Sequence, residues 1–292
     1  KLPDEMVPIT VDHKQQVSIR AGAAFFQITA MDSEDYPELP DVNGKSGVTM
    51  PQSALKAMIS GTIFSVSENQ ARPIQTGCLM EVTEDSVTMV AVDSFRLARR
   101  TWHTENAANH TLKFVVPAAG LKEIERILED SDEPVTFTLG DKHILFSIGD
   151  ALLVSRVLEG EFIDWRRVVP TNCGTVLTAN VAELTSSIER VSLIISEKVK
   201  SPVRCVFGDN MADFRTANTI GSAHDTCSIA GNGGELEIGF NSRYLLDALR
   251  VIPSEEVTLE LQNGLSPIVF TPCDKKYDFA YMVLPVRLRS NS

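Results

Sequence analysis

SALKAMISGTIFSVS at residues 53–67 and AELTSSIERVSLIIS at residues 182–196 decide the fold of this chain. Apolar residues recur in both at helical spacing, with Leu55 and Met58 in the first and Leu184 in the second. This period predicts an amphipathic helix that lies on a sheet. The two segments start 129 residues apart, which indicates an internal repeat.

A second pair of segments supports the repeat. AGLKEIERILEDSDEPVTFTL begins residues 119–160, and SRYLLDALRVIPSEEVTLEL begins residues 242–288. Both predict a helix followed by three strands, because stretches such as VTFTL at 135–139 and VTLEL at 257–261 alternate with a period of two. The two segments are therefore expected to fold alike.

The first 50 residues carry only the back end of this pattern. MVPITV at 6–11, QQVSIRAG at 15–22 and AAFFQITAM at 23–31 correspond to the strands that follow a helix in the next unit. A whole unit of about 128 residues ending near Met50 would begin roughly 78 residues before Lys1. We therefore expect the front part of the first unit to be absent.

The repeat predicts an α+β fold of repeated domains, with two helices per complete domain packed on antiparallel sheets. Segments 32–47 and 159–174 follow corresponding strands and are rich in proline, glycine and acidic residues. Such segments mark unit boundaries. The expected domains are residues 1–48, the C-terminal part of a first domain, then 49–172 and 173–292.

Composition excludes several classes of protein. Among 292 residues, 43% are hydrophobic and 23% charged, which is typical of soluble globular proteins. The apolar runs are shorter than the roughly 18 residues of a membrane span. The first residues show no signal peptide, so the cytoplasm is the expected location. The five cysteines are scattered without a CxxC pair, which argues against disulfides and zinc, and no cofactor is expected.

The net charge of −12 argues against a protein that binds nucleic acid through overall basicity. Contact with DNA would need cations gathered on one sheltered surface. An enzyme is also poorly supported, since the chain has no GxGxxG, P-loop, GxSxG or HExxH motif. Asp93 is a lone carboxylate with no partner that the sequence reveals. We interpret the chain as non-catalytic.

Three stretches carry a resemblance to a known family. VAVDSFRLA at 90–98, VSRVLEGEFIDWRRVVP at 154–170 and YMVLPVRL at 281–288 resemble the bacterial beta sliding clamp, the beta subunit of DNA polymerase III, and the similarity covers the whole chain. The resemblance implies the DNA clamp fold and a homodimeric ring that encircles double-stranded DNA without sequence preference. It also implies a processivity factor that tethers the replicative polymerase, and an ATP-driven clamp loader and repair proteins as further partners.

In this family, partners insert a short peptide into a pocket between the second and third domains. The resemblance places that pocket here at Thr76, Val92, Ser94, Phe95, Arg96, Leu97, Ile163, Arg167, Val168, Asn241, Tyr244, Leu265, Pro267, Met282, Val283, Leu284, Pro285, Val286, Arg287 and Leu288. Arg96, Arg167 and Asn241 are expected to orient the peptide backbone between apolar walls. Without the resemblance, residues 282–284 would be interpreted as an ordinary buried strand.

The chain departs from the family pattern at several of these positions. Ser94 and Phe95 stand where the family commonly has Gly-His, and 163–165 reads Ile-Asp-Trp instead of Pro-Asp-Tyr. Residues 289–292 extend past the usual terminal Arg-Leu, and Ala118 and Ala119 occupy an expected turn where the family often has basic residues. These differences concern the preferred partner motif and the DNA contacts.

Two further surfaces follow from the resemblance. The expected DNA-facing cations are Lys56, Arg72, Lys122, Arg126, Arg190, Lys198, Lys200, Arg243 and Arg250. The alternative for each is an ordinary solvated side chain. The expected ring interface is Phe26 and Ile28 against Leu193 and Ile194, with interior core as the alternative for the first two. A protein-binding repeat scaffold unrelated to DNA is the alternative function. It would bind peptides without being retained on circular DNA.

Overall fold

The computed structural model describes residues 6–32, 34, 42, 47–105, 111–195 and 201–288. The chain divides into two compact units, Lys1–Asp41 and Val42–Ser292. The predicted boundary at residue 172 falls inside the second unit. No division falls there because one ten-stranded sheet contains strands from both sides of that boundary.

The first unit is a small antiparallel meander. Its strands are β1 (Ile9–Val11), β2 (Gln16–Ala21) and β3 (Ala24–Thr29). In the register, Val17 faces Ile28 and Ile19 faces Phe26. Phe26 is 49% and Ile28 54% exposed, so within the described residues neither is interior core. Because Phe25 on the other face is also exposed, both faces of this sheet present apolar side chains.

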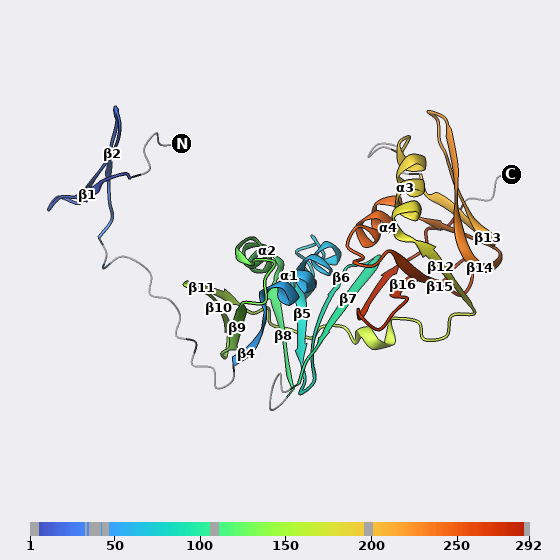
Figure 1. The fold of residues 1–292 in the computed structure, drawn as a ribbon, viewed down its shortest axis with the longest axis horizontal. Coiled ribbons are helices and arrows are strands. Elements are labelled where there is room, and N and C mark those ends of the chain that lie inside the picture. Colours follow the sequence, from blue (N-terminus) through green and yellow to red (C-terminus); the bar gives the residue numbers. More distant parts are fainter. Residues whose placement is uncertain are drawn as a thin grey trace. The chain divides into compact units, whose positions relative to one another are not determined.

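The second unit contains two sheets and four helices within the described residues. Figure 1 shows the helices along one side of the large sheet. The four-stranded sheet has the order β11-β10-β9-β4, and the ten-stranded sheet has the order β13-β14-β12-β15-β16-β17-β7-β6-β5-β8. The elements are β4 (Gly47–Pro51), α1 (Gln52–Ser60), β5 (Gly77–Val82), β6 (Ser86–Val92), β7 (Arg96–His103), β8 (Leu112–Pro117), α2 (Ala118–Ile127), β9 (Pro134–Leu139), β10 (His143–Ile148), β11 (Ala151–Arg156), β12 (Thr175–Asn180), α3 (Val181–Ser192), β13 (Val203–Ala217), β14 (Ser222–Phe240), α4 (Ser242–Leu249), β15 (Glu256–Leu261), β16 (Ile268–Pro272) and β17 (Phe279–Val283), with 3-10 turns η2 (Ile63–Ser65), η3 (Pro73–Thr76) and η4 (Trp165–Arg167).

The predicted repeat is confirmed by the order of these elements. In both halves a strand runs into a helix, and α2 and α4 are each followed by three antiparallel strands. The first strand of each half, β4 or β12, pairs with the strand that follows the second helix, β9 or β15. The fold is therefore α+β, with the same module built twice in this unit.

Each helix buries the apolar stripe that the sequence indicates. Leu55, Met58 and Ile59 of α1 are at most 1% exposed, and Leu184 and Ile188 of α3 are at most 2% exposed. Both helices are shorter than the quoted segments. After Gly61, the chain passes through Thr62, whose hydroxyl donates to the Met58 carbonyl at 2.8 Å, into the 3-10 turn η2.

One strand pair joins the two repeats. β17 lies antiparallel to β7, with Tyr281 opposite Ala98 and Met282 opposite Leu97. Phe64 of η2 packs edge-on against Tyr281, with ring centroids 5.7 Å apart. A small cluster on this pair includes Leu97 and Met282, with Trp165 of the linker packed against it. We call the β7–β17 pair the seam.

The start of α3 allows a test of its local sequence code. Asn180 caps the helix, since its side-chain oxygen accepts the Glu183 backbone N–H at 3.0 Å. Asn180→Ala should lower the free energy of unfolding by roughly 1 kcal/mol because one N–H loses its partner. Asn180→Asp keeps an acceptor and is the control in urea unfolding. Equal losses in both variants would show that the cap is not the cause.

Candidate functional site

The seam brings together two stretches that lie far apart in the sequence. Val283 faces Arg96, and the Leu284 backbone N–H donates to the Phe95 carbonyl at 2.8 Å. The tail then crosses β14, because the Val286 N–H donates to the Gly239 carbonyl at 2.7 Å. Two of the three segments expected to form a partner pocket are thus neighbours in the fold.

An aromatic stack is exposed on this part of the molecule. Phe95 is 53% exposed, and its ring stacks on Tyr244 of α4 with centroids 5.8 Å apart at 19°. Val286 is 41% exposed. A side chain at Gly239 would meet the Val286 carbonyl oxygen at 2.7 Å, so glycine allows the tail to lie this close. We call Phe95, Tyr244, Leu284, Val286 and Leu288 the seam surface.

Arg96 is held from several sides beneath the stack. Its guanidinium contacts Asp93 at 3.0 Å and Asp247 of α4 at 2.6 Å. It also lies 4.6 Å from the Tyr244 ring centroid and 5.6 Å from that of Phe64. With its side chain only 10% exposed, Arg96 ties the two repeats together. Its charge is matched by two carboxylates, and its role in orienting a peptide stays a prediction.

The other predicted pocket residues divide by burial. Val92, Leu97, Met282 and Val283 are at most 4% exposed and form the floor of the seam. The side-chain oxygen of Asn241 accepts the Arg243 N–H at 3.0 Å and caps α4, so this oxygen is also engaged. Five of the remaining positions are half-buried: Thr76, Ile163, Pro267, Leu284 and Pro285. Five are exposed: Ser94, Arg167, Val168, Leu265 and Arg287.

Sequence reasoning missed a buried acid behind the linker. Glu81 of β5 accepts the Trp165 indole N–H at 3.2 Å and pairs with Arg166 at 2.8 Å and Lys113 at 3.4 Å. Arg166 also lies over the Trp165 ring, 4.2 Å from its centroid. We call Glu81, Trp165 and Arg166 the linker latch. Trp165 in place of a tyrosine was the signal in the sequence, but its partner is 84 residues away.

The latch shifts the acidity of Glu81. Burial alone would raise the pKa of this carboxyl, but hydrogen bonds from Arg166 and Trp165, with the charges of Arg166 and Lys113, bring the pKa below its ordinary value. The ionised form is therefore favoured in the folded chain. The latch holds η4 on the sheet, directly before Val168.

Most of the predicted DNA-facing cations are paired with acids. Lys56 contacts Asp130 at 3.0 Å and Arg250 contacts Glu189 at 2.8 Å. Arg126, Arg190 and Arg243 pair with Glu123, Asp225 and Asp247 in that order. Arg72 and Lys122 are exposed and have no acidic partner within the described residues, while Lys198 and Lys200 lie outside them. The helix-bearing side of the sheet is thus less positive than expected.

The predicted ring-interface residues are exposed rather than buried. Leu193 is 83% exposed, and Ile194, whose carbonyl accepts the Asn218 side-chain amide at 2.8 Å, is half-buried. Phe26 and Ile28 belong to the other compact unit. The ring contact therefore stays a prediction for both sets.

Groups suited to metal chemistry are not gathered in the part of the chain that the structure describes. It holds no cluster of three or more histidine, cysteine or acidic side chains that could bind a metal ion. The five cysteines are free thiols. Of the described helices, none is long and apolar enough to cross a membrane.

The latch makes a testable prediction about pH. Glu81→Gln should lower the free energy of unfolding by roughly 1–3 kcal/mol at neutral pH, since the buried carboxylate loses its charge-assisted hydrogen bonds to Arg166 and Trp165. A lowered pKa means that this stabilisation is present above the unfolded pKa of about 4.3 and is lost as the pH falls through the folded pKa. Urea unfolding between neutral and acid pH measures the difference between variant and parent.

Glu84→Gln is the matched control, because Glu84 is exposed in the adjacent turn between β5 and β6. If the difference in unfolding free energy between Glu81→Gln and the parent stays unchanged in acid, the ionised Glu81 does not stabilise the linker latch.

Two family profiles match the second unit. One, described as the central domain of the DNA polymerase III beta subunit, covers residues 49–164, and the other, described as its C-terminal domain, covers residues 166–287. The two matched ranges meet in the linker, which agrees with the predicted repeat of two modules. The profiles thus cover most of the chain.

Known relatives extend over nearly the whole chain. The beta sliding clamp of Staphylococcus epidermidis is 29% identical over 289 residues, which is 98% of this chain and 76% of that protein. The crystal structure of a putative DNA polymerase III beta subunit from Eubacterium rectale is 32% identical with a TM-score of 0.91, covering 99% of this chain and 78% of that one.

The sliding clamp of Bacillus subtilis is 29% identical with a TM-score of 0.91, covering 99% of this chain and 77% of that chain. A clamp from Pseudomonas aeruginosa crystallised with bound griselimycin is 29% identical with a TM-score of 0.89, covering 97% and 76%. With the duplicated module and the seam, these matches show that the chain belongs to the DNA polymerase III beta subunit family, the bacterial beta sliding clamps.

Proposed function

We propose that this chain is a processivity factor that encircles duplex DNA as part of a homodimeric ring and binds the replicative polymerase through the seam surface. The single observation that carries the proposal is the exposed Phe95–Tyr244 stack at the join of the two repeats, in a chain of the clamp family. Exposed Phe95 and Val286 and half-buried Tyr244 gather on one face, and contiguous apolar patches of this kind mark binding surfaces.

The chemistry of the seam surface favours a short peptide with apolar anchors. Phe95 and Val286 offer apolar area, and Arg287 and Arg167 add exposed cations to the tail and the linker. Arg167 pairs with Asp164 at 3.0 Å, yet its side chain is 87% exposed and remains free to contact a backbone carbonyl or a carboxylate. Apolar anchors with a charged rim are a common mode of peptide recognition.

A ligand-bound relative supports a binding surface in this family, since the P. aeruginosa clamp was crystallised with griselimycin. In this chain the wall is more apolar than in relatives with histidine beside the stack, because Phe95 stands there. We therefore infer that the preferred anchors are aromatic or long aliphatic side chains.

Tethering by encirclement agrees with the charge of the chain. A net charge of −12 disfavours tight binding to phosphates, whereas a ring needs only weak contacts to remain on DNA. Exposed Arg72 and Lys122 are the cations best placed to make them, because neither is occupied by an acid within the described residues. The polymerase, the clamp loader and repair proteins would compete for the seam surface.

Loss of the stack should weaken peptide binding. We expect Phe95→Ala to lower the affinity for a fluorescent clamp-binding peptide by roughly tenfold, or about 1.4 kcal/mol, because the stack and its apolar area are lost together. Fluorescence anisotropy measures this change. Leu152→Ala is the control, since Leu152 on β11 is 59% exposed and belongs to the other sheet. Equal affinity in both variants would remove the seam surface as the site.

Encirclement has its own test. After incubation with a clamp loader and ATP, the full-length protein with a complete first unit should be retained on nicked circular DNA and released when the circle is linearised. Gel filtration of the DNA-bound fraction measures retention. A protein-binding scaffold unrelated to DNA predicts no retention, and equal retention on circular and linear DNA would exclude a topological link.

A further inference from the structure

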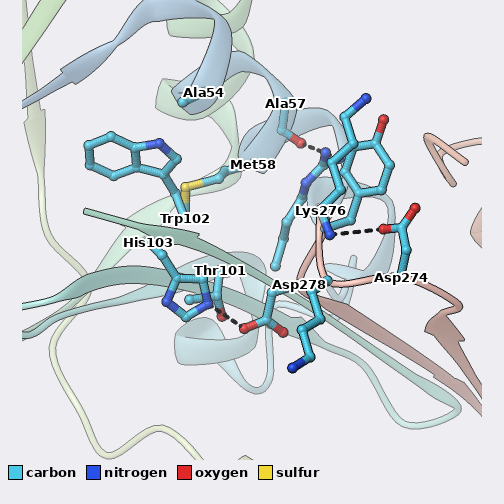
Figure 2. A pocket seen from close by; sticks show the side chains of 12 residues that line it. Ala54, Ala57, Met58, Thr101, Trp102, His103, Asp274, Lys276 and Asp278 are labelled. Carbon is cyan, nitrogen blue, oxygen red and sulfur yellow. Dashed lines mark hydrogen bonds and ion pairs between the residues drawn. The ribbon is translucent and has the colours of Figure 1, made fainter.

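A separate cavity lies at the other end of the seam. It has a volume of about 570 Å³ and is formed by α1, the end of β7 and the turn between β16 and β17. Figure 2 shows Ala54, Ala57 and Met58 on one side and His103, Lys276 and Asp278 on the other. β7 runs from Arg96 beside the seam surface to His103 at this cavity, so the two places are distinct.

Of the two acids that line the cavity, Asp278 is paired with cations and, across the described residues, Asp274 is not. Asp278 pairs with Arg99 at 2.6 Å and with His103 at 2.8 Å. Burial alone would raise the pKa of Asp278, but Arg99 and His103 bring it below its ordinary value, so the carboxylate stays ionised and matched. Asp274 accepts the Lys276 backbone N–H at 2.9 Å.

The cations of the cavity are less engaged. Arg100 donates to the Ala57 carbonyl at 3.1 Å and makes no ion pair among the described residues. Lys275 and Lys276 are exposed, and within the described part of the chain neither has an acidic partner. The ammonium of Lys276 lies 5.1 Å from the Tyr277 ring centroid. Asp274 also lines the cavity and has no ion pair among the described residues, so three unpaired cations stand against one unpaired carboxylate. This net positive charge in an acidic protein favours an anionic ligand.

The cavity also offers an aromatic and apolar wall. Trp102 is half-buried and Met58 is 1% exposed, and both line the cavity together with Ala54 and Ala57. A nucleotide combines a flat base with a phosphate, and proteins bind single strands by joining aromatic rings with cations. A base in a duplex is stacked and paired, so it cannot reach such a wall. The volume lies within the range of roughly 300–1,000 Å³ for small-ligand sites.

We propose that this cavity binds a nucleotide unit of single-stranded DNA, with its base against Trp102 and its phosphates at Arg100, Lys275 and Lys276. The inference rests on the proposed function, because it requires DNA on the helix-bearing side of the sheet, where α1 lies (Figure 1). A single strand held here would stand next to the encircled duplex.

Binding of a fluorescein-labelled oligothymidylate tests the proposal. Anisotropy at low salt should show binding to the parent chain and a loss of about tenfold in affinity for Lys275→Ala combined with Lys276→Ala. The slope of log affinity against log salt should become shallower by roughly 1.4, since each phosphate contact to a single strand contributes about 0.7. Lys142→Ala, in the turn between β9 and β10, is the control and should bind like the parent.

Tryptophan fluorescence gives a second readout, because a loose electrostatic contact with the lysines would not change the emission of Trp102. The chain has two tryptophans, Trp102 and Trp165. The oligonucleotide should quench the parent, and Trp102→Phe, which keeps Trp165, should show no quenching. Quenching that persists in Trp102→Phe would overturn the proposal.

Two further results would also overturn it. A blunt duplex that binds as tightly and is weakened as much by the lysine variants would show a phosphate contact without a base. Inorganic phosphate that displaces the oligonucleotide at matched ionic strength would show an anion site only. If the oligonucleotide does not bind but the protein is still retained on circular DNA, only the cavity proposal fails. If the oligonucleotide binds but the protein is not retained, the ring proposal fails.

Discussion

The backbone pairing of β17 with β7 is the constraint on which the rest of the second unit depends. It joins two copies of one module into a single ten-stranded sheet, so the copies share hydrogen bonds rather than a flexible hinge. Paired strands also satisfy edges that would otherwise be open to aggregation. The seam surface and the proposed nucleotide cavity lie at opposite ends of this pair.

Side chains lock the seam where backbone pairing ends. Arg96 matches Asp93 and Asp247 from different repeats, and it supports the Tyr244 ring that carries the exposed stack. Glu81 performs the same task for the linker by binding Trp165 and Arg166. Buried charges of this kind are costly when unpaired, so they specify one arrangement rather than add much net stability.

The site was only partly predictable. Residues from 92–97 and 282–288 were expected together, and the strand register places them side by side. Their roles were less clear, because Arg96 and Asn241 are used within the fold while Phe95 and Val286 remain exposed. Lys275 and Lys276 lie in an ordinary turn of the sequence, and only the packing of that turn near α1 places them at a cavity.

The sequence by itself determined the repeat and the kind of element in the repeated segments, because helical and strand periodicity are local. The family followed from three motifs, at 90–98, 154–170 and 281–288. Tertiary structure decided which charges are free. Glu81 and Trp165 are 84 residues apart, and Arg96 and Asp247 are 151 residues apart. Pairing at such separations depends on side-chain geometry across the seam, and no local pattern encodes it, so the division between structural and available cations appears only in the folded chain.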